Sequence, residues 1–490
     1  MSTLYFSLLL GLPLLSGILC AFLKRRTLLE AITLFSTALT FVGALLLSAA
    51  VLRGTSLITP KGWFFLDALS AYIMLIVTGS AFVVSVYSIG YLRRQIVNRK
   101  VDAKMLRLYY MLLNIFLFTM LLVLISNNLG FLWIGSESTT LATAFLVAYY
   151  ERESSIEAAW KYVIICSVGI GLALFGIILT YFSALHVVSS QSTALNWTSL
   201  IAVANQLNPD ILKLAFVFAL VGFGTKAGLA PMHTWKPDAY GEAPAPISAL
   251  MAAGLVNVAL YSLLRFYILV NKAVAVGFAP TLFVIFGLLS MVIAVPFILV
   301  QRDFKRLLAY SSVEHVGIIV FAFGLGTPLA YFGALLHILN NALAKLVLFL
   351  TLGNVRLAYD SKIMRRVSGA IKVIPVSATL LIVGVFAITG WPPFGVFVSE
   401  FTIVTAGFAA GNIFPSLVFI GVVATIFVGF IYYATQMVFG EPHRRIDEGD
   451  GDAFSLILIG ALVAILFLLG IAIPSFLSNF IRQAVAIVQG

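Results

Sequence analysis

Long apolar runs separated by short polar segments follow one another along the whole chain. Most of the runs reach the roughly 20 residues that a helix needs to cross the hydrocarbon core of a bilayer. The pattern therefore predicts an all-α integral membrane protein with about fourteen transmembrane helices. The predicted spans lie at 3–22, 28–51, 66–90, 106–126, 128–149, 157–184, 211–235, 245–270, 276–300, 306–326, 328–353, 373–411, 415–439 and 454–474.

Two of these spans contain helix-breaking residues at membrane depth. The seventh holds Pro231, with Pro237 two residues beyond its end, and the twelfth, which is too long for one crossing, holds the run 390–393, Gly-Trp-Pro-Pro. Unwound backbone survives inside a membrane only where protein or water satisfies its polar groups. A pair of simple proline kinks is one explanation. Because the breaks lie five spans apart, the pattern also predicts two inverted five-helix repeats with a transport site between them.

The sequence thus predicts one membrane domain with four parts. Three peripheral helices occupy 1–105, the first repeat (helices four to eight) 106–270, the second repeat (helices nine to thirteen) 276–439, and the last helix and tail 454–490.

Lysine and arginine residues gather in alternate loops. Cytoplasmic loops carry an excess of both residue types, so the bias predicts a cell inner membrane protein with both termini outside. The outward loops then hold little beyond Arg53, Lys61, Lys213 and Lys272. The inward loops hold many more, among them Lys24, Arg25, Arg26, Arg93, Arg94, Arg99, Lys100, Arg302, Arg306, Arg365, Arg366, Arg444 and Arg445.

Composition supports the membrane class and excludes several kinds of chemistry. The chain is 61% hydrophobic and 10% charged, whereas soluble domains carry about 25% charged residues. Its net charge of +11 follows from the loops and does not indicate nucleic-acid binding. The two cysteines, Cys20 and Cys166, lie in apolar runs without metal-site spacing. The sequence predicts no metal or cofactor in this chain, so any redox chemistry belongs to a partner.

Ionisable residues within the predicted spans are the candidate functional residues. Each one costs about 2.5–3.5 kcal/mol at the bilayer centre on insertion scales, so such residues mark ion pathways by default. Proton transfer suits them because burial brings lysine and carboxylate titration towards neutral pH, where histidine also titrates. For each lone histidine a packing role is the alternative. The candidates are Glu137, Lys226, His233, Glu314, His315, His337, Lys345 and Glu400.

The eleventh span places three polar residues on one helix face. His337, Asn341 and Lys345 are spaced at i, i+4 and i+8, which predicts a hydrated file or, alternatively, a hydrogen-bonded seam between helices. A Glu137–Lys226 pair, if it forms, could gain or lose protons as it opens and closes. Lys161 lies near a span end, and Arg265 is expected to be an interfacial anchor.

At these residues the chain resembles the antiporter-like membrane subunits of respiratory complex I, of group 4 membrane-bound hydrogenases and of Mrp antiporters, and most of all the component F type of hydrogenase-4. The similar motifs run in the same order over about 65–440. They lie at 127–137, 157–162, 224–235, 303–315 and 392–401, and include Gly-Thr-Lys226-Ala-Gly-Leu-Ala-Pro231-Met-His233-Thr-Trp and Pro392-Pro393-Phe-Gly-Val-Phe-Val-Ser-Glu400.

The resemblance implies fourteen helices, two inverted repeats and a hydrophilic axis. On that axis Glu137, Lys226 and Glu400 match the charges of the fifth, seventh and twelfth helices, and His315, His337 and Lys345 match further positions. The chain departs from the family pattern at four positions. They are Asn257, where several complex I subunits carry a lysine, Asn341, where histidine is frequent, and Lys236 and Tyr240, which replace the usual leucine and histidine.

These observations predict a proton-translocating subunit of a multisubunit energy-converting oxidoreductase, either a membrane-bound hydrogenase or a complex I-like enzyme. Its partners would be other membrane and redox subunits, the lipid bilayer and protons, with sodium as a possible second ion. The alternatives are a non-pumping membrane scaffold, an Mrp-type sodium/proton antiporter subunit, and a stand-alone transporter of a small solute.

Overall fold

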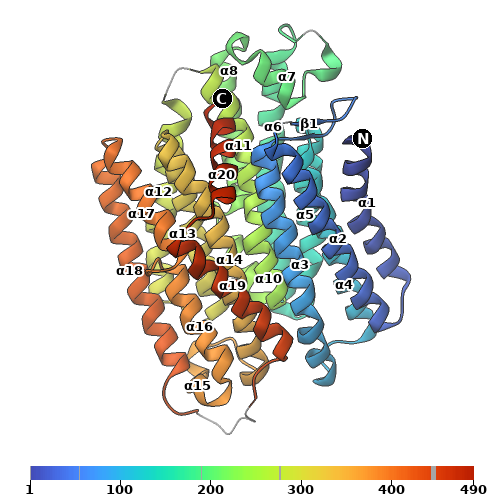
Figure 1. The fold of residues 1–490 in the computed structure, drawn as a ribbon, viewed down its shortest axis with the longest axis vertical. Coiled ribbons are helices and arrows are strands. Elements are labelled where there is room, and N and C mark those ends of the chain that lie inside the picture. The colour runs from blue at the N-terminus through green and yellow to red at the C-terminus, as the bar shows by residue number, and fades with distance from the viewer. Residues whose placement is uncertain (1, 55, 189, 275–276, 443–448) are drawn as a thin grey trace.

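The computed structural model describes residues 2–54, 56–188, 190–274, 277–442 and 449–490, so Arg444 and Arg445 lie outside the described residues. A bundle of long helices makes up nearly all of it (Figure 1). The spanning helices are α1 (Ser2–Phe22), α2 (Arg26–Leu52), α3 (Ala68–Val97), α4 (Ala103–Ile125), α5 (Leu129–Val147), α6 (Glu153–Ala184), α8 (Pro209–Ala227), α10 (Ala245–Leu250) continued by η3 (Met251–Leu255) and α11 (Val256–Ala273), α12 (Phe278–Leu299), α13 (Phe304–Gly324), α14 (Pro328–Tyr359), α16 (Pro375–Ile388) with α17 (Gly395–Ala409), α18 (Ile413–Val438) and α19 (Ala453–Ile471).

Short elements connect these helices. They are the hairpin β1 (Leu57–Ile58) and β2 (Phe65–Leu66), the helices α7 (Trp197–Ala202), α9 (Trp235–Glu242), α15 (Ala370–Val373) and α20 (Ser475–Gln489), and the turns η1 (Gln191–Thr193), η2 (Ala204–Gln206) and η4 (Met364–Arg366).

The predicted number of spans is confirmed. Among the described residues, eleven helices are long and apolar enough to cross a membrane. The remaining three crossings are α5, α8 and the α16–α17 pair, which are shorter, more polar or interrupted. The α8 crossing and the α16–α17 crossing contain the predicted breaks, because α8 and α16 each end where the sequence places glycine and proline.

Side-chain caps fix the starts of the helices that carry the candidate residues. Asn128 accepts from Gly130 N at 2.9 Å before α5, and Asp303 accepts from Lys305 N at 2.8 Å before α13. Such caps satisfy backbone N–H groups that have no partner inside the helix. They therefore set the register of the candidate residues on each helix.

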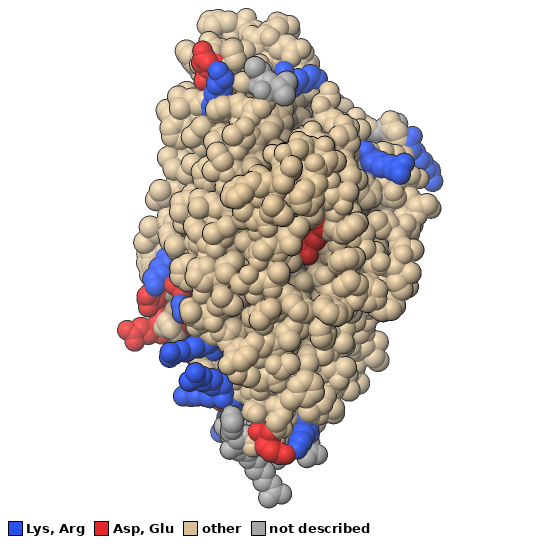
Figure 2. Space-filling view, turned by 90° about the vertical axis from the view of Figure 1, so that its left-hand side faces the viewer, with Lys and Arg blue, Asp and Glu red and all other residues tan. Residues whose placement is uncertain are grey.

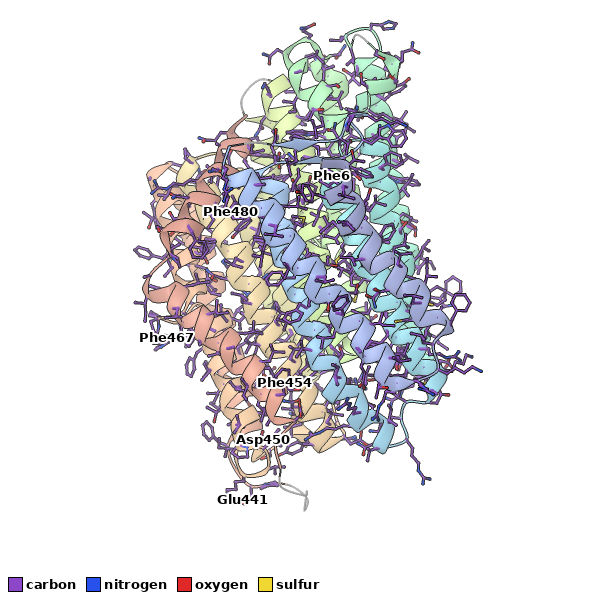
Figure 3. All side chains as sticks on the ribbon, turned by 45° about the vertical axis from the view of Figure 1, so that its right-hand side comes forward. Phe6, Glu441, Asp450, Phe454, Phe467 and Phe480 are labelled. Carbon is purple, nitrogen blue, oxygen red and sulfur yellow. The ribbon has the colours of Figure 1, made fainter. Side chains whose placement is uncertain are left out.

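Helix α14 forms the centre of the C-terminal half. It packs against α13, α16, α17, α19 and α3, and 89% of its most apolar segment is buried. The outer helices α12, α18 and α19 are buried over only about a third of their length. In Figure 3, α19 runs obliquely across the bundle from Phe454 to Phe467, and α20 with Phe480 lies beyond its end. The polar residues of α14 consequently face protein.

Charged side chains gather at the two ends of the molecule (Figure 2). A broad band without Lys or Arg separates these ends on the face shown, as a protein that crosses a bilayer requires. Acidic atoms are nevertheless visible in the middle of this band. Both chain termini lie at the same end of the bundle (Figure 1).

The expectation that Arg265 is an interfacial anchor is wrong. Its guanidinium makes two hydrogen bonds to the carboxylate of Asp67, at 2.7 and 2.8 Å, and both side chains are at most 3% exposed. The rings of Trp197 and Tyr261 lie 4.2 and 4.8 Å from the guanidinium carbon. The apolar span of α11 carries this arginine because its charge is fully partnered inside the protein.

Candidate proton-transfer site

The first helix break lies between α8 and α9. Gly228 ends α8 in a left-handed conformation with φ of +79°, which glycine adopts without steric cost. Two carbonyl oxygens freed by the break are satisfied by the next helix. Thr225 O accepts from Trp235 Nε1 at 2.8 Å, and Ala227 O accepts from Lys236 Nζ at 2.7 Å. Side chains from the chain itself therefore close this break.

Lys226 occupies the last turn of α8 and is 1% exposed. Its ammonium donates to the hydroxyl of Thr140 on α5 and lies 3.5 Å from the hydroxyl of Tyr162 on α6. The Tyr162 hydroxyl in turn lies 2.7 Å from Thr143 Oγ1. Hydroxyl groups from two neighbouring helices thus take the place that a carboxylate would take in an ion pair.

Glu137 lies on the same helix as Thr140 but is only half-buried. Its Oε1 accepts from Ser167 Oγ at 2.6 Å, and Oε2 has no hydrogen-bond partner. No ion pair joins Glu137 to Lys226 within the described part of the chain, although the two charges attract each other. Ile134 and Leu141 on this helix face are 46% and 52% exposed. Glu137 therefore lies near the outer surface of the bundle, with its Oε2 atom buried.

The second helix break lies between α16 and α17. Gly390 has φ of +68°, and a Cβ atom there would collide with Glu400 Oε2. The absence of a side chain lets the carboxylate of Glu400, which is 6% exposed, lie against the break. On α14, Asn340 donates to Gly395 O at 2.7 Å and so holds the start of α17.

Three side chains connect α13, α14 and α17 by hydrogen bonds. His315 Nδ1 lies 3.0 Å from His337 Nε2, and His337 Nδ1 lies 3.0 Å from Ser399 Oγ. Glu400 follows Ser399, and its carboxylate lies within 4.8 Å of ring nitrogens of both histidines. Imidazole can accept a proton on one nitrogen and release one from the other. The arrangement can therefore pass protons towards Glu400.

Lys345 and Glu314 lie beside this histidine pair. Lys345 Nζ donates to Ser311 Oγ at 2.9 Å and to Leu308 O at 3.1 Å. Glu314 Oε2 lies 3.8 Å from His315 Nε2, and the Glu314 and Lys345 charges attract each other. Both residues are at most 2% exposed.

The predicted polar stripe on the eleventh span joins this network only in part. His337 and Lys345 take part in it, whereas the Asn341 side-chain oxygen is buried and has no hydrogen-bond partner in the described structure. Its neighbour Asn340 makes the contact to α17 instead.

Three other candidates lie outside these contacts. The His233 ring packs edge-on against Phe297 and Tyr310, with centroids 6.3 and 6.2 Å away. Lys161 is exposed and pairs with Glu157 and Asp238 at 2.6 and 3.2 Å. Asn257 donates to Ala253 O of its own helix at 2.7 Å. They remain candidates without a direct contact to the histidine pair.

Sequence reasoning missed the hydroxyl groups and Lys236 as site residues. A usable signal is present, because a serine or threonine lies within three residues of four central charges, although not of Lys345. Thr140 follows Glu137, Thr225 precedes Lys226, Ser311 and Ser312 precede Glu314, and Ser399 precedes Glu400.

The donor atoms of His315, His337 and Glu400 are of the kind that bind zinc. The positive charges of Lys236 and Lys345 act on His315 and would repel a divalent cation. The surroundings therefore fit proton transfer better than metal binding.

A known protein family matches more than half of the chain. Residues 126–428 match the transmembrane family described as NADH:quinone oxidoreductase/Mrp antiporter. The chain belongs to this family. Residues 62–99 also match the N-terminal region of chain 5 of NADH-ubiquinone oxidoreductase (complex I). The chain is 39% identical to the hydrogenase-4 component F homolog of Methylacidiphilum infernorum, and the alignment covers 84% of each chain. It is 30% identical to hydrogenase-4 component B of Escherichia coli, but spans only 49% of that protein's length.

Solved structures of family-like subunits share the fold. A chain of the archaeal membrane-bound sulfane sulfur reductase superimposes with a TM-score of 0.87 at 25% identity, over 99% of this chain and 97% of the other. A chain of the Mrp complex from Dietzia sp. gives a TM-score of 0.87 at 18% identity, over 99% and 98% of the two chains. A chain of complex I from Thermus thermophilus gives 0.76 at 21% identity, over 95% and 96%. The last two likenesses concern the fold alone.

Proposed function

We propose that this family member is the proton-translocating membrane subunit of a multisubunit energy-converting oxidoreductase, such as a membrane-bound hydrogenase or a complex I-like enzyme. Electron transfer takes place in partner subunits, and this chain has no cofactor of its own. The observation that carries the proposal is the buried connection from His315 through His337 and Ser399 towards Glu400. Its last member lies against a helix break, where transporters bind their ions.

The other candidate residues have distinct roles in this proposal. Glu137, at the outer surface of α5, responds to a charge change in a neighbouring subunit. That change alters the attraction between Glu137 and Lys226 and so controls when Lys226 gives up its proton. The proton then reaches Lys345, passes through the histidine pair and leaves through Glu400.

The arrangement in the membrane is part of the same proposal. The chain lies in the cytoplasmic membrane with both termini outside, because the loops at the opposite end carry most of the lysine and arginine residues. The two breaks lie in equivalent helices of two five-helix repeats, 106–270 and 276–439. The five-span distance between the breaks supports this division.

The test is proton translocation by the native complex. An affinity tag on this chain would isolate the complex, and mass spectrometry would identify its other subunits. In vesicles, reduced methyl viologen would drive redox turnover while pyranine trapped inside reports pH. Lys226→Met and Glu400→Gln should each reduce translocation at least about tenfold, whereas Lys213→Met, at an exposed ion pair, should not. Full translocation by both site variants in an assembled complex would refute the proposal.

The same vesicles separate the alternatives. An Mrp-type role, suggested by 28% identity to Na(+)/H(+) antiporter subunit A1 of Staphylococcus aureus, predicts proton movement driven by a sodium gradient without redox turnover. The chain spans 57% of the length of that protein. A scaffold role predicts an assembled complex in which no substitution in the histidine pair changes translocation.

A further inference from the structure

Lys236 is a buried cation that the proposed path does not yet include. It lies in the first turn of α9 and is 0% exposed. No carboxylate in the described structure forms an ion pair with it; its hydrogen bonds go to Ala227 O at 2.7 Å and Ser312 O at 3.3 Å. A lysine held only by carbonyl oxygens inside an apolar bundle is costly to maintain. Such a residue calls for a functional explanation.

On one side, Lys236 is close to the surroundings of Lys226. Its carbonyl partner Ala227 directly follows Lys226 in α8. The buried thiol of Cys166 on α6 interacts with the charges of both lysines. The ring of Tyr162, whose hydroxyl approaches Lys226, lies 4.7 Å from the ring of Trp235, the residue before Lys236.

On the other side, Lys236 and Lys345 both donate hydrogen bonds to carbonyl oxygens of the same turn of α13. Ser312 O accepts from Lys236, and Ser312 Oγ donates to Leu308 O at 3.0 Å. The same Leu308 oxygen accepts from Lys345 Nζ at 3.1 Å. The two ammonium groups also repel each other electrostatically. Lys236 thus contacts both α8, at the first helix break, and α13, the helix that carries Glu314 and His315.

We propose that Lys236 carries the proton from the Lys226 side of the bundle to Lys345. This inference rests on the proposed function and adds its central step. In that step one N–H bond of the Lys226 ammonium breaks and, through intervening water, one forms on the neutral Lys236 amine. A second transfer of the same kind, through water, moves the proton from Lys236 to the neutral Lys345 amine. One proton moves and no electron is transferred.

Gly228 leaves space for the Lys236 ammonium at the end of α8. A Cβ atom at Gly228 would lie 2.9 Å from Lys236 Nζ, so the bare glycine leaves the room that the ammonium needs at the end of α8. The four-carbon stem can turn between Ala227 O and Ser312 O without moving the backbone, because lysine side chains are long and flexible.

The test compares two substitutions that keep a hydrogen-bond donor but cannot exchange the proton. Glutamine is neutral and arginine is permanently charged. In vesicles, reduced methyl viologen would drive redox turnover of the tagged native complex, and trapped pyranine would report proton translocation. Lys236→Gln and Lys236→Arg should both reduce proton flux at least about tenfold, while the subunits still purify together.

Lys305 offers a matched control. It is also buried, at 1% exposed, and its ammonium likewise donates to two carbonyl oxygens, those of Gly241 and Ala243. Lys305→Gln should leave proton flux within about twofold of the unsubstituted complex. An equal loss in Lys236→Gln and Lys305→Gln would assign Lys236 a merely structural role.

The outcomes also separate this inference from the proposed function. Normal flux in either Lys236 variant, together with loss in Lys226→Met and Glu400→Gln, would overturn the role of Lys236 alone. Normal flux in all four variants, or no flux in the unsubstituted complex, would overturn the proposed function and this inference with it.

Discussion

His315 Nδ1 and His337 Nε2 face each other at 3.0 Å inside the bundle. At this distance one nitrogen donates and the other accepts, since two N–H groups cannot point at each other. The facing nitrogens therefore share a single proton. When this proton moves onto His337 Nε2, the ring can release another proton from Nδ1, which faces Ser399. Every proton that follows the proposed path through this pair must therefore cross this single hydrogen bond.

His337→Gln should interrupt the path while keeping hydrogen bonds to its neighbours. We expect proton flux to fall at least about tenfold, because an amide does not exchange protons as imidazole does. Vesicles with trapped pyranine provide the measurement. His186→Gln, at an exposed position, is the control of the same residue type. Unchanged flux in His337→Gln would remove the histidine pair from the path.

Gly228→Ala should strain the backbone at the helix break and displace the Lys236 side chain. The left-handed conformation costs a residue with a Cβ about 1–2 kcal/mol, and the new atom would press on the lysine side chain. We expect a lower thermal unfolding temperature of the complex in detergent and reduced proton flux. Gly171→Ala on α6 is the control, because a Cβ there meets nothing within 4 Å, and it should slightly raise stability. Equal behaviour of the two variants would contradict this account of the break.

Asp67→Asn should destabilise the protein by about 3–5 kcal/mol, because it leaves the Arg265 charge buried without its partner. Thermal unfolding in detergent would show the loss, and Asp210→Asn, in an exposed pair with Lys213, should change stability by at most about 0.5 kcal/mol. A loss as small at Asp67 as at Asp210 would mean that the buried pair contributes little.

The same pair predicts a pH dependence of stability. Burial raises the pKa of Asp67, but Arg265 and Ser70 lower it more, so the net pKa lies below its ordinary value of 3.8. A folded-state pKa below the unfolded value stabilises the fold above the unfolded value. This contribution should be complete above about pH 4 and should disappear as the pH falls through the folded-state pKa. In Asp67→Asn this acid-dependent component should be missing.

Glu137→Gln should reduce proton translocation without preventing assembly of the complex. The residue is half-buried near the outer surface of α5, and the amide oxygen of glutamine can still accept the hydrogen bond from Ser167, so we expect the fold to tolerate the change. We expect the subunits to purify together, while proton translocation during redox turnover falls at least about tenfold. Glu441→Gln, at a residue whose side chain is 80% exposed, is the control. Normal translocation in Glu137→Gln would exclude it as the residue that senses the partner.

The sequence predicted the membrane fold well because its strongest signals are physical necessities. Apolar length decides where a helix crosses a bilayer, and glycine and proline mark the breaks after Ala227 and Ile388. Burial of Lys226, Glu314, Lys345 and Glu400 followed from their place within apolar runs.

The partners of these charges could not be predicted, because they come from other helices. The sequence suggested a Glu137–Lys226 pair, but rotation of α5 turns Thr140 towards the lysine and Glu137 towards the surface. Arg265 pairs with Asp67, 198 positions away, and no periodic pattern signals such a contact. Lys236 is a departure from the family pattern in the sequence, and only its contacts reveal that it lies between α8 and α13.

The carbonyl end of α8 is already occupied by a cation that belongs to the chain. In transporters with broken helices, exposed carbonyl oxygens of this kind are ligands for sodium. Here the Ala227 oxygen holds the ammonium of Lys236, which can shed or gain a hydrogen ion but cannot diffuse away. A tethered occupant of this kind would favour charge that travels as protons, because a free alkali ion would have to displace the ammonium before it could bind the same oxygen.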